Sequence, residues 1–405
     1  MKIPSILKSD LQTSISVLLF VGINLLFYFK YLLRISFPIA LIGSLAYLLF
    51  ITLVFRFIFH GSNIATNPEN EKTNLDKKKK HSYIVIALWI LIGLFILSSV
   101  FVLQHVPYEN IKVDRWEIIK VFWDSASKGL NPYGVPNSIG NYPGAMPMYF
   151  LLYYPFYMIN EIGYCLLIAL LVWLYFVYRR FSVQTFALLT LLTLSSAPIY
   201  WEIVTRSTIL VNSFLFAYFF IYLFGIGRFS TRQFYLSAIV GGLIFSTRNV
   251  FVLPLLIWAI FIFRCGILDV KRLFLWGCVF ALSFALTFLP FFLLWPQEFL
   301  LRNPFLTQSS VPMPFAYVLA SLFVAFVLGW CSHNLADVFF YSAIVLILII
   351  TAHVGYWIAR NGWTYGLLTG GQIGDISYYL FSFPFLLEMI ARRSNAKEVE
   401  QTTVD

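Results

Sequence analysis

Two arginines lie between apolar segments of this chain, where burying a charged side chain costs free energy unless another group compensates the charge. Arg206 lies in the polar stretch 201–207, and Arg248 lies between two short apolar runs. An arginine at membrane depth is costly unless it is paired or faces a cavity. Its planar guanidinium binds phosphate through two parallel hydrogen bonds, so both side chains are candidate phosphate ligands. The alternative for Arg206 is an internal ion pair with Glu202, four residues earlier.

A second group of ionisable side chains lies in the stretch 112–128, which reads KVDRWEIIKVFWDSASK. At roughly 100° per residue, its aromatic and branched side chains share one face of a helix, and most charged ones share the opposite face. Arg115 departs from this pattern. The acidic side chains of the stretch are Asp114, Glu117 and Asp124. An amphipathic helix with aromatic anchors is suited to the membrane interface.

Metal and nucleotide chemistry have little support in the sequence. The five histidines and four cysteines form no HExxH or CxxC spacing. A Gly-rich segment near residue 370 precedes no phosphate-loop lysine, although its Gln372 and Asp375 are candidates to reach a site. His105 is a candidate to assist a neighbouring acid. The cysteines are expected to be packing residues.

The composition predicts an integral membrane protein. Hydrophobic residues make up 60% of the chain, charged residues 11%, and the mean hydropathy is +0.82. Soluble proteins average about 45–50% apolar and about 25% charged residues, so this chain cannot cover a water-exposed surface. The net charge of +10 is therefore interpreted as a signal of helix orientation, and nucleic acid is not expected as a partner.

Apolar runs predict twelve transmembrane helices and an all-α fold, because lipid offers no partner for the backbone. They lie at about 14–33, 36–58, 83–104, 162–178, 182–200, 208–227, 234–246, 250–264, 272–295, 313–330, 337–357 and 375–391. Basic residues recur at every second gap, which places both termini in the cytoplasm and the loop 106–145 on the other side. The two short runs that flank Arg248 are typical of segments that line a site.

The long loop also contains two turn motifs. Asn131-Pro132-Tyr133 follows the amphipathic stretch, and Tyr142-Pro143-Gly144 precedes a second interfacial or partly re-entrant helix at 146–159. A core span, an outer loop with an early acidic residue, an interfacial helix and these two motifs resemble the GT-C membrane glycosyltransferases. The closest similarity is to the branch that uses polyprenyl-phosphate sugars, and it covers about 83–264 by motif.

The resemblance implies a domain organisation. Residues 1–60 would be two added transmembrane helices, and 61–82 a basic cytoplasmic linker. Residues 83–295 would contain the seven-helix core of the family, with the outer loop 106–145. Variable helices would follow at 296–391, and a cytoplasmic tail at 392–405.

The resemblance also implies a reaction, in which an acidic residue of the first outer loop is the general base. Asp114 is at the matching position. Glu117 competes for this role because the paired acids of many members are absent, and Glu202 is a further acidic candidate. Without these paired acids, a divalent metal remains possible as a cofactor but has no support from the motif. The implied substrate-binding residues are Arg206, Arg248, Tyr133, Tyr142, Arg115 and Gln372.

The sequence thus predicts an inverting glycosyltransferase that uses a polyprenyl-phosphate-linked sugar. The acceptor would be a glycan, lipid or protein of the cell envelope, and the expected location is a bacterial inner membrane with the site facing outward. Two alternatives stay open. A lipid or glycan transporter or flippase would also have interrupted helices and buried arginines, and an envelope-polymer ligase would carry its large outer loop late in the chain.

Overall fold

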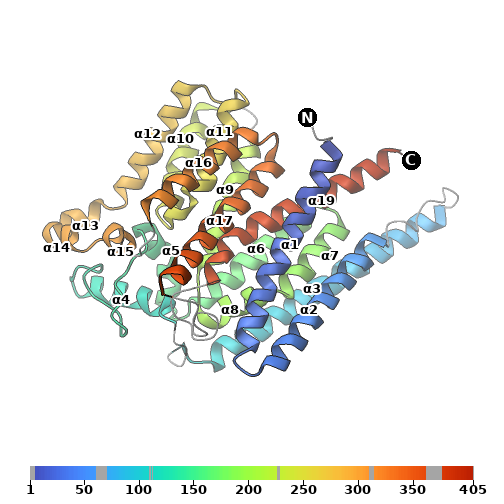
Figure 1. Cartoon of the computed structure of the whole chain (residues 1–405), viewed down its shortest axis with the longest axis horizontal. Helices are drawn as coiled ribbons and strands as arrows, with labels where there is room; N and C mark the ends of the chain where they lie inside the picture. Colours follow the sequence, from blue (N-terminus) through green and yellow to red (C-terminus); the bar gives the residue numbers. More distant parts are fainter. Residues whose placement is uncertain are drawn as a thin grey trace.

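The structure is a computed structural model that describes residues 5–60, 71–108, 111, 113–225, 229–309, 314–361 and 376–404. Every regular element within these ranges is a helix, as the apolar runs predict. Figure 1 shows long helices gathered in one bundle, with several short helices at one edge. The helices are α1 Ser5–Leu32, α2 Phe37–His60, α3 Glu71–His105, α4 Arg115–Ser127, α5 Pro147–Met158, α6 Gly163–Arg180, α7 Val183–Leu194, α8 Ala197–Thr205, α9 Ile209–Gly225, α10 Thr231–Phe245, η3 Asn249–Phe251, α11 Val252–Arg264, α12 Val270–Leu286, α13 Leu289–Leu294, α14 Pro296–Leu301, α15 Pro304–Ser309, α16 Phe315–Cys331, α17 Leu335–Asn361, η4 Ile376–Ser382 and α19 Phe383–Val404.

Five helices of the described ranges are long and apolar enough to cross a membrane, by length and composition. They contain Leu11–Leu32, Phe37–Arg56, Ser82–His105, Gly163–Arg180 and Leu335–Arg360. α7 and α8 satisfy the same criterion together, although they meet at a bend of 54°. Five or six spans are fewer than the twelve that the sequence predicted, because several predicted runs are broken or form shorter helices such as α9 and α16.

The bend between α7 and α8 is stabilised by the first helix of the chain. Pro198 lies in the first turn of α8, where its missing N–H removes no helical hydrogen bond. The side chain of Asn24 accepts a hydrogen bond from the Ala197 backbone N–H at 3.1 Å. The Tyr28 hydroxyl donates to the Ser195 carbonyl at 3.0 Å. Because α1 also packs on the last helix, α19, it belongs to the bundle core.

Helices α10 and α12 approach each other closely along one side of the bundle. Gly242 makes this possible, because a Cβ at this position would overlap the carbonyl oxygen of Phe280 on α12. The Ser283 hydroxyl of α12 donates to the Ile239 carbonyl of α10 at 2.9 Å. Small side chains at such contacts are typical of helix packing in membranes. This pair forms one wall of the cavity described below.

The loop 106–145 and the segment after it carry two of the predicted helices. The amphipathic stretch 112–128 forms α4, whose apolar face buries Trp116, Ile119 and Phe122. The segment 146–159 forms α5, which begins at Pro147 and packs against α4. The Phe122 ring stacks on that of Phe150 with centroids 3.6 Å apart. Aromatic packing therefore holds the two helices together and fixes the residues between them.

Three predicted boundaries differ from the helices observed. α3 begins at Glu71, inside the stretch 61–82 that was expected to be a linker. The predicted span 272–295 is divided, since α12 ends at Leu286 and α13 begins at Leu289. α19 continues to Val404, through most of the expected tail 392–405.

Candidate functional site

Asp114 directly precedes α4 and is held by two amide side chains of the same loop. Its Oδ2 accepts hydrogen bonds from Asn141 Nδ2 at 2.7 Å and from Asn137 Nδ2 at 3.3 Å. The carboxylate is half-buried. A carboxylate is able to accept a proton from a substrate hydroxyl.

Glu117 is fixed by the same turn of the loop. Its two oxygens accept hydrogen bonds from the backbone N–H of Ser138 at 2.8 Å and from the Ser138 hydroxyl at 3.0 Å. Asp114 and Glu117 therefore both hold the segment 137–141 against the start of α4. The two candidate bases thus lie three residues apart and have different hydrogen-bond partners: Asp114 bonds to Asn137 and Asn141, and Glu117 bonds to Ser138.

Asp124, farther along α4, has a different environment. Its Oδ1 accepts a hydrogen bond of 2.6 Å from the Tyr157 hydroxyl of α5. This bond, with partial burial, raises the pKa of Tyr157 to about 12. Asp124 thus links α4 to α5 through a strong hydrogen bond to a neutral phenol.

Arg115 reaches from the start of α4 to the segment before α19. Its Nη2 donates to the Ser377 hydroxyl at 3.1 Å, and its guanidinium lies 5.3 Å from the ring centroid of Tyr378. Glu202 is fully buried in α8, and its Oε2 accepts from the Leu210 N–H at 3.1 Å. Its Oε1 has no hydrogen-bond partner among the described residues.

Arg206 is enclosed by the protein, with 2% of its side chain exposed. It has a left-handed backbone conformation (φ 51°) just after α8. Its Nη2 lies 3.3 Å from Glu161 Oε2, and it donates to the carbonyls of Leu103 and Val106 at 2.8 and 2.7 Å. The ion pair suggested for Arg206 is therefore made with Glu161, not with Glu202. These bonds tie the end of α3 to α8.

Arg248 has a more open arrangement than Arg206. Its guanidinium carbon lies 4.7 Å from the ring centroid of Tyr149, a cation–π contact, and its Nε has no hydrogen-bond partner among the described residues. The Tyr149 hydroxyl shares a hydrogen bond of 2.8 Å with Thr208, at the start of α9. The half-buried Arg248 is therefore held by a ring face and retains donors for another group.

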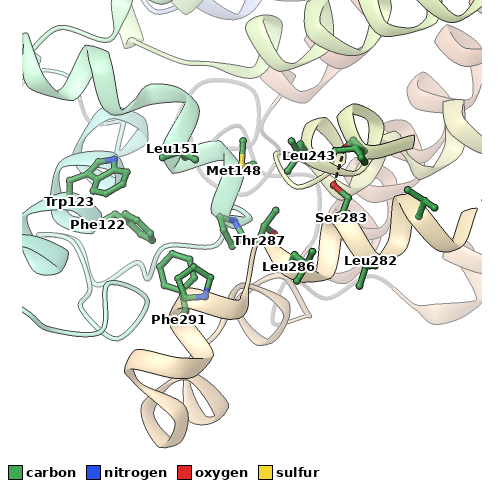
Figure 2. A pocket seen from close by; sticks show the side chains of 14 residues that line it. Phe122, Trp123, Met148, Leu151, Leu243, Leu282, Ser283, Leu286, Thr287 and Phe291 are labelled. Atoms are coloured by element: carbon green, nitrogen blue, oxygen red, sulfur yellow. Dashed lines mark hydrogen bonds between the residues drawn. The ribbon is translucent and has the colours of Figure 1, made fainter. Parts of the chain in front are cut away.

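An apolar cavity of about 580 Å³ is lined by residues of α4, α5, α10, α12 and α13. Figure 2 shows Phe122, Trp123 and Leu151 from α4 and α5 on one side, and Leu243, Leu282 and Leu286 from α10 and α12 on the other. Several lining side chains are also exposed at the surface of the bundle, including Leu151, Leu282 and Leu286. The cavity is thus bordered by apolar surface and is wide enough for a hydrocarbon chain.

Hydroxyl groups connect the cavity to the arginine. Thr287 lines the cavity, and its Oγ1 shares a hydrogen bond of 2.8 Å with the hydroxyl of Ser246. The backbone N–H of Met148, another lining residue, donates to the Ser246 hydroxyl at 3.4 Å, and Tyr149 N–H donates to the Ser246 carbonyl at 3.2 Å. Arg248 follows Ser246 by two residues. The hydroxyl pair therefore connects the cavity wall to the segment that carries Arg248, although Arg248 itself is not a lining residue.

The remaining predicted site residues are distributed differently. Tyr133 is buried, and its hydroxyl donates to the Ala145 carbonyl at 3.2 Å, so it closes the loop on itself. Tyr142 is half-buried, with the Arg302 guanidinium 4.4 Å from its ring centroid. Gln372 and Asp375 lie outside the described residues. The His105 ring bonds to the carbonyl of Phe101 at 2.9 Å, within its own helix.

A metal ion has no evident set of ligands in the described ranges, where no three His, Cys, Asp or Glu side chains gather. The neighbours of Asp114 are amide nitrogens that donate to it, together with the adjacent Arg115, and this environment does not fit a cation.

Sequence reasoning missed Tyr149, Thr208 and the cavity. Tyr149 lies in an apolar aromatic run, where nothing distinguishes it from a lipid-facing side chain. Ser246 and Arg248 were visible in the sequence as a polar step between two short helices. No protein-family model, curated protein or solved structure matches this chain.

Proposed function

We propose that this protein is an integral membrane glycosyltransferase that moves a sugar from a polyprenyl phosphate to an acceptor hydroxyl. The observation that carries the proposal is the apolar cavity of about 580 Å³, whose lining residue Thr287 is joined to the segment of Arg248 by the hydrogen bond to Ser246. A polyprenyl phosphate combines a long hydrocarbon tail with a phosphate. The cavity suits the tail, and the guanidinium suits the phosphate.

The donor enters from the bilayer. Leu151, Leu282 and Leu286 border the cavity and are exposed at the bundle surface, so a lipid tail reaches it without crossing water. The phosphate then lies near Arg248, whose Nε has no other partner within the described part of the chain. Arg115 supplies a second positive charge on the loop side. Arg206 is not included, because its donors bond to Glu161 and to backbone carbonyls.

The reaction is a single displacement. The acceptor oxygen bonds to the anomeric carbon while its proton passes to the carboxylate of Asp114. The bond from the anomeric carbon to the phosphate oxygen breaks, and polyprenyl phosphate leaves with the electron pair. Attack opposite the leaving group inverts the anomeric carbon. Arginine donors stabilise the negative charge that grows on the phosphate.

The membrane topology is part of the proposal. Together with the six candidate spans, counting α7 and α8 as one, the helices α9, α10, α11, α12, α16 and α19 would complete twelve crossings in a GT-C-like arrangement. The loop 106–145 would face outward across a bacterial inner membrane, because basic residues favour the cytoplasmic side. The acceptor would be an envelope glycan, lipid or protein.

Mass spectrometry of lipid-linked and envelope glycans tests the proposal. Cells without the gene are expected to accumulate a polyprenyl-phosphate sugar and to lack that sugar on one envelope component, and complementation is expected to reverse both changes. The purified full-length chain in vesicles made from the mutant's lipids is expected to release polyprenyl phosphate when acceptor is added. Unchanged glycans in both pools, together with no release, would contradict the proposal.

A further inference from the structure

Three short helices, α13 to α15, form a projection at the edge of the bundle, and among their residues only Pro290 and Phe291 line the cavity. We call residues Leu289–Ser309 the elbow. Figure 1 shows α13 and α14 at the margin of the molecule, beyond the end of α12 and next to α15. Each of the three helices has six residues, which is about 9 Å of length. None can cross a hydrocarbon core of about 30 Å, so the elbow stays on one side of the membrane.

The inner face of the elbow packs on the loop 106–145. The rings of Phe291 and Phe299 lie 5.3 and 5.8 Å from that of Tyr133, measured between centroids. The indole N–H of Trp295 donates to the Gly129 carbonyl at 3.0 Å. Phe291 also lines the cavity. This face is therefore covered by the protein itself.

The outer face of the elbow is apolar and uncovered. Leu293, Leu294, Leu300, Leu301 and Phe305 are 67%, 65%, 65%, 75% and 49% exposed. Only two charged residues, Glu298 and Arg302, occur between residues 289 and 307. A monomeric surface in water rarely exposes so dense an apolar group, so this face needs an occupant.

The occupant is identified by the surface that the elbow continues. α12 leads directly into it and exposes Phe274, Leu282 and Leu286 at 73%, 60% and 53%. With 17 residues, α12 is about 26 Å long, close to the thickness of the hydrocarbon core. The elbow therefore begins where the hydrocarbon core ends. A protein-binding site would have a polar rim around its apolar centre, whereas here exposed leucines continue from Leu286 of α12 to Leu289, Leu293 and Leu294 of the elbow.

We propose that the elbow is embedded in the membrane interface, with its leucine and phenylalanine side chains among the acyl chains of one leaflet. The partner is the lipid bilayer itself. The elbow then positions the loop 106–145, because the Arg302 guanidinium lies over the Tyr142 ring and Asn141, the preceding residue, bonds to Asp114. The depth of the elbow in the interface sets the depth of that carboxylate.

Electron paramagnetic resonance of the full-length chain in phosphatidylglycerol–phosphatidylcholine vesicles tests the proposal. The exposed Cys265, Cys278 and Cys331 are first replaced by serine. Nitroxide labels are then placed by Leu294→Cys or Leu301→Cys, and by Lys128→Cys as the matched control. Lys128 is exposed and polar and precedes Gly129, which the elbow contacts.

Accessibility to oxygen, which concentrates in lipid, is compared with accessibility to a water-soluble nickel complex. The labels at residues 294 and 301 are expected to favour oxygen several-fold relative to the label at 128. Equal access to nickel at all three positions would overturn the proposal, because the elbow would then lie in water. Protection from both reagents would also overturn it, since another protein surface would cover the face. The measurement needs no enzymatic activity, so its outcome is independent of the proposed function.

Discussion

The two ends of α6 show two ways in which this bundle uses charged side chains. At the end where α6 stops, Glu388 is fully buried, with Arg392 at 2.7 Å and Arg180 at 3.8 Å. Beside it, Arg393 pairs with Asp337 at 3.2 Å and bonds to Gln12 of α1.

Near the end where α6 starts, the charged side chains of the candidate site contact neutral groups and not side chains of opposite charge. Arg248 faces a tyrosine ring, and Asp114 faces two amides. The Arg206–Glu161 pair, just before α6, follows the first pattern. The comparison shows that the role of an arginine in an apolar bundle, structural or ligand-binding, can be assigned only once its partners are known. Matched pairs join helices, whereas charges held by neutral groups remain available to a ligand.

The largest expected effect comes from the candidate base. Asp114→Asn is expected to lower the rate of sugar transfer about 10²–10⁴-fold, the usual contribution of a general base. The asparagine oxygen still accepts hydrogen bonds from Asn137 and Asn141, so the thermal melting point should change little. Transfer by the purified variant measures the effect.

Asp124→Asn is the matched control, because it alters an acid on the same helix that bonds to Tyr157. It is expected to keep most of the activity. Full activity in Asp114→Asn, with loss in Glu117→Gln, would assign the base to Glu117 instead.

Substitutions in the buried ion pairs of Glu388 are expected to lower the free energy of unfolding. Glu388→Ala leaves Arg180 and Arg392 without their buried partner, and removing one member of a buried pair costs about 3 kcal/mol or more. Denaturation in detergent measures the loss of unfolding free energy. Glu298→Ala, at an exposed position, is expected to change it by less than about 0.5 kcal/mol. An unaltered midpoint for Glu388→Ala would show that the buried pairs do not stabilise the bundle.

Substituting Arg248 and Arg206 compares a charge held by a neutral group with a charge in a matched pair. Arg248→Ala is expected to lower transfer about 10–100-fold, since hydrogen bonds to charged groups contribute about 1.5–3 kcal/mol. Its melting point should stay near that of the native chain. Arg206→Ala is expected to lower stability by about 2 kcal/mol, because Glu161 and two carbonyls lose their donor. Reversed results would exchange the roles of the two side chains.

The smallest expected effect on activity and stability comes from substituting Tyr149, whose ring contacts the Arg248 guanidinium. Tyr149→Phe removes the hydrogen bond of 2.8 Å to Thr208 and keeps the aromatic face. A loss of about 0.5–1.5 kcal/mol in stability and a change of a few-fold in transfer are expected. Tyr149→Leu removes the face as well and should weaken transfer further. Equal activity of the two variants would show that the ring does not hold the guanidinium.

Much of the fold could be predicted because it depends on local patterns. The apolar runs indicated an all-helical membrane protein, and the amphipathic stretch 112–128 indicated the helix α4 with one apolar face, of which Trp116, Ile119 and Phe122 are buried. The polar step at Ser246 marked one part of the candidate site. The number of spans was harder to predict, because a bend such as that before α8, or a break such as that after Leu286, depends on neighbouring helices.

The sequence by itself determined that this chain is helical, apolar and built for a membrane, since run length and composition are properties of each segment alone. Only the tertiary structure decided which charges are paired. Arg206 was four residues from Glu202 yet bonds to Glu161, 45 residues away in the chain. The cavity, too, is formed where residues of α4, α5, α10, α12 and α13 meet. A pairing partner is chosen by the packing of distant helices, and that packing cannot be derived from the spacing of residues along one helix.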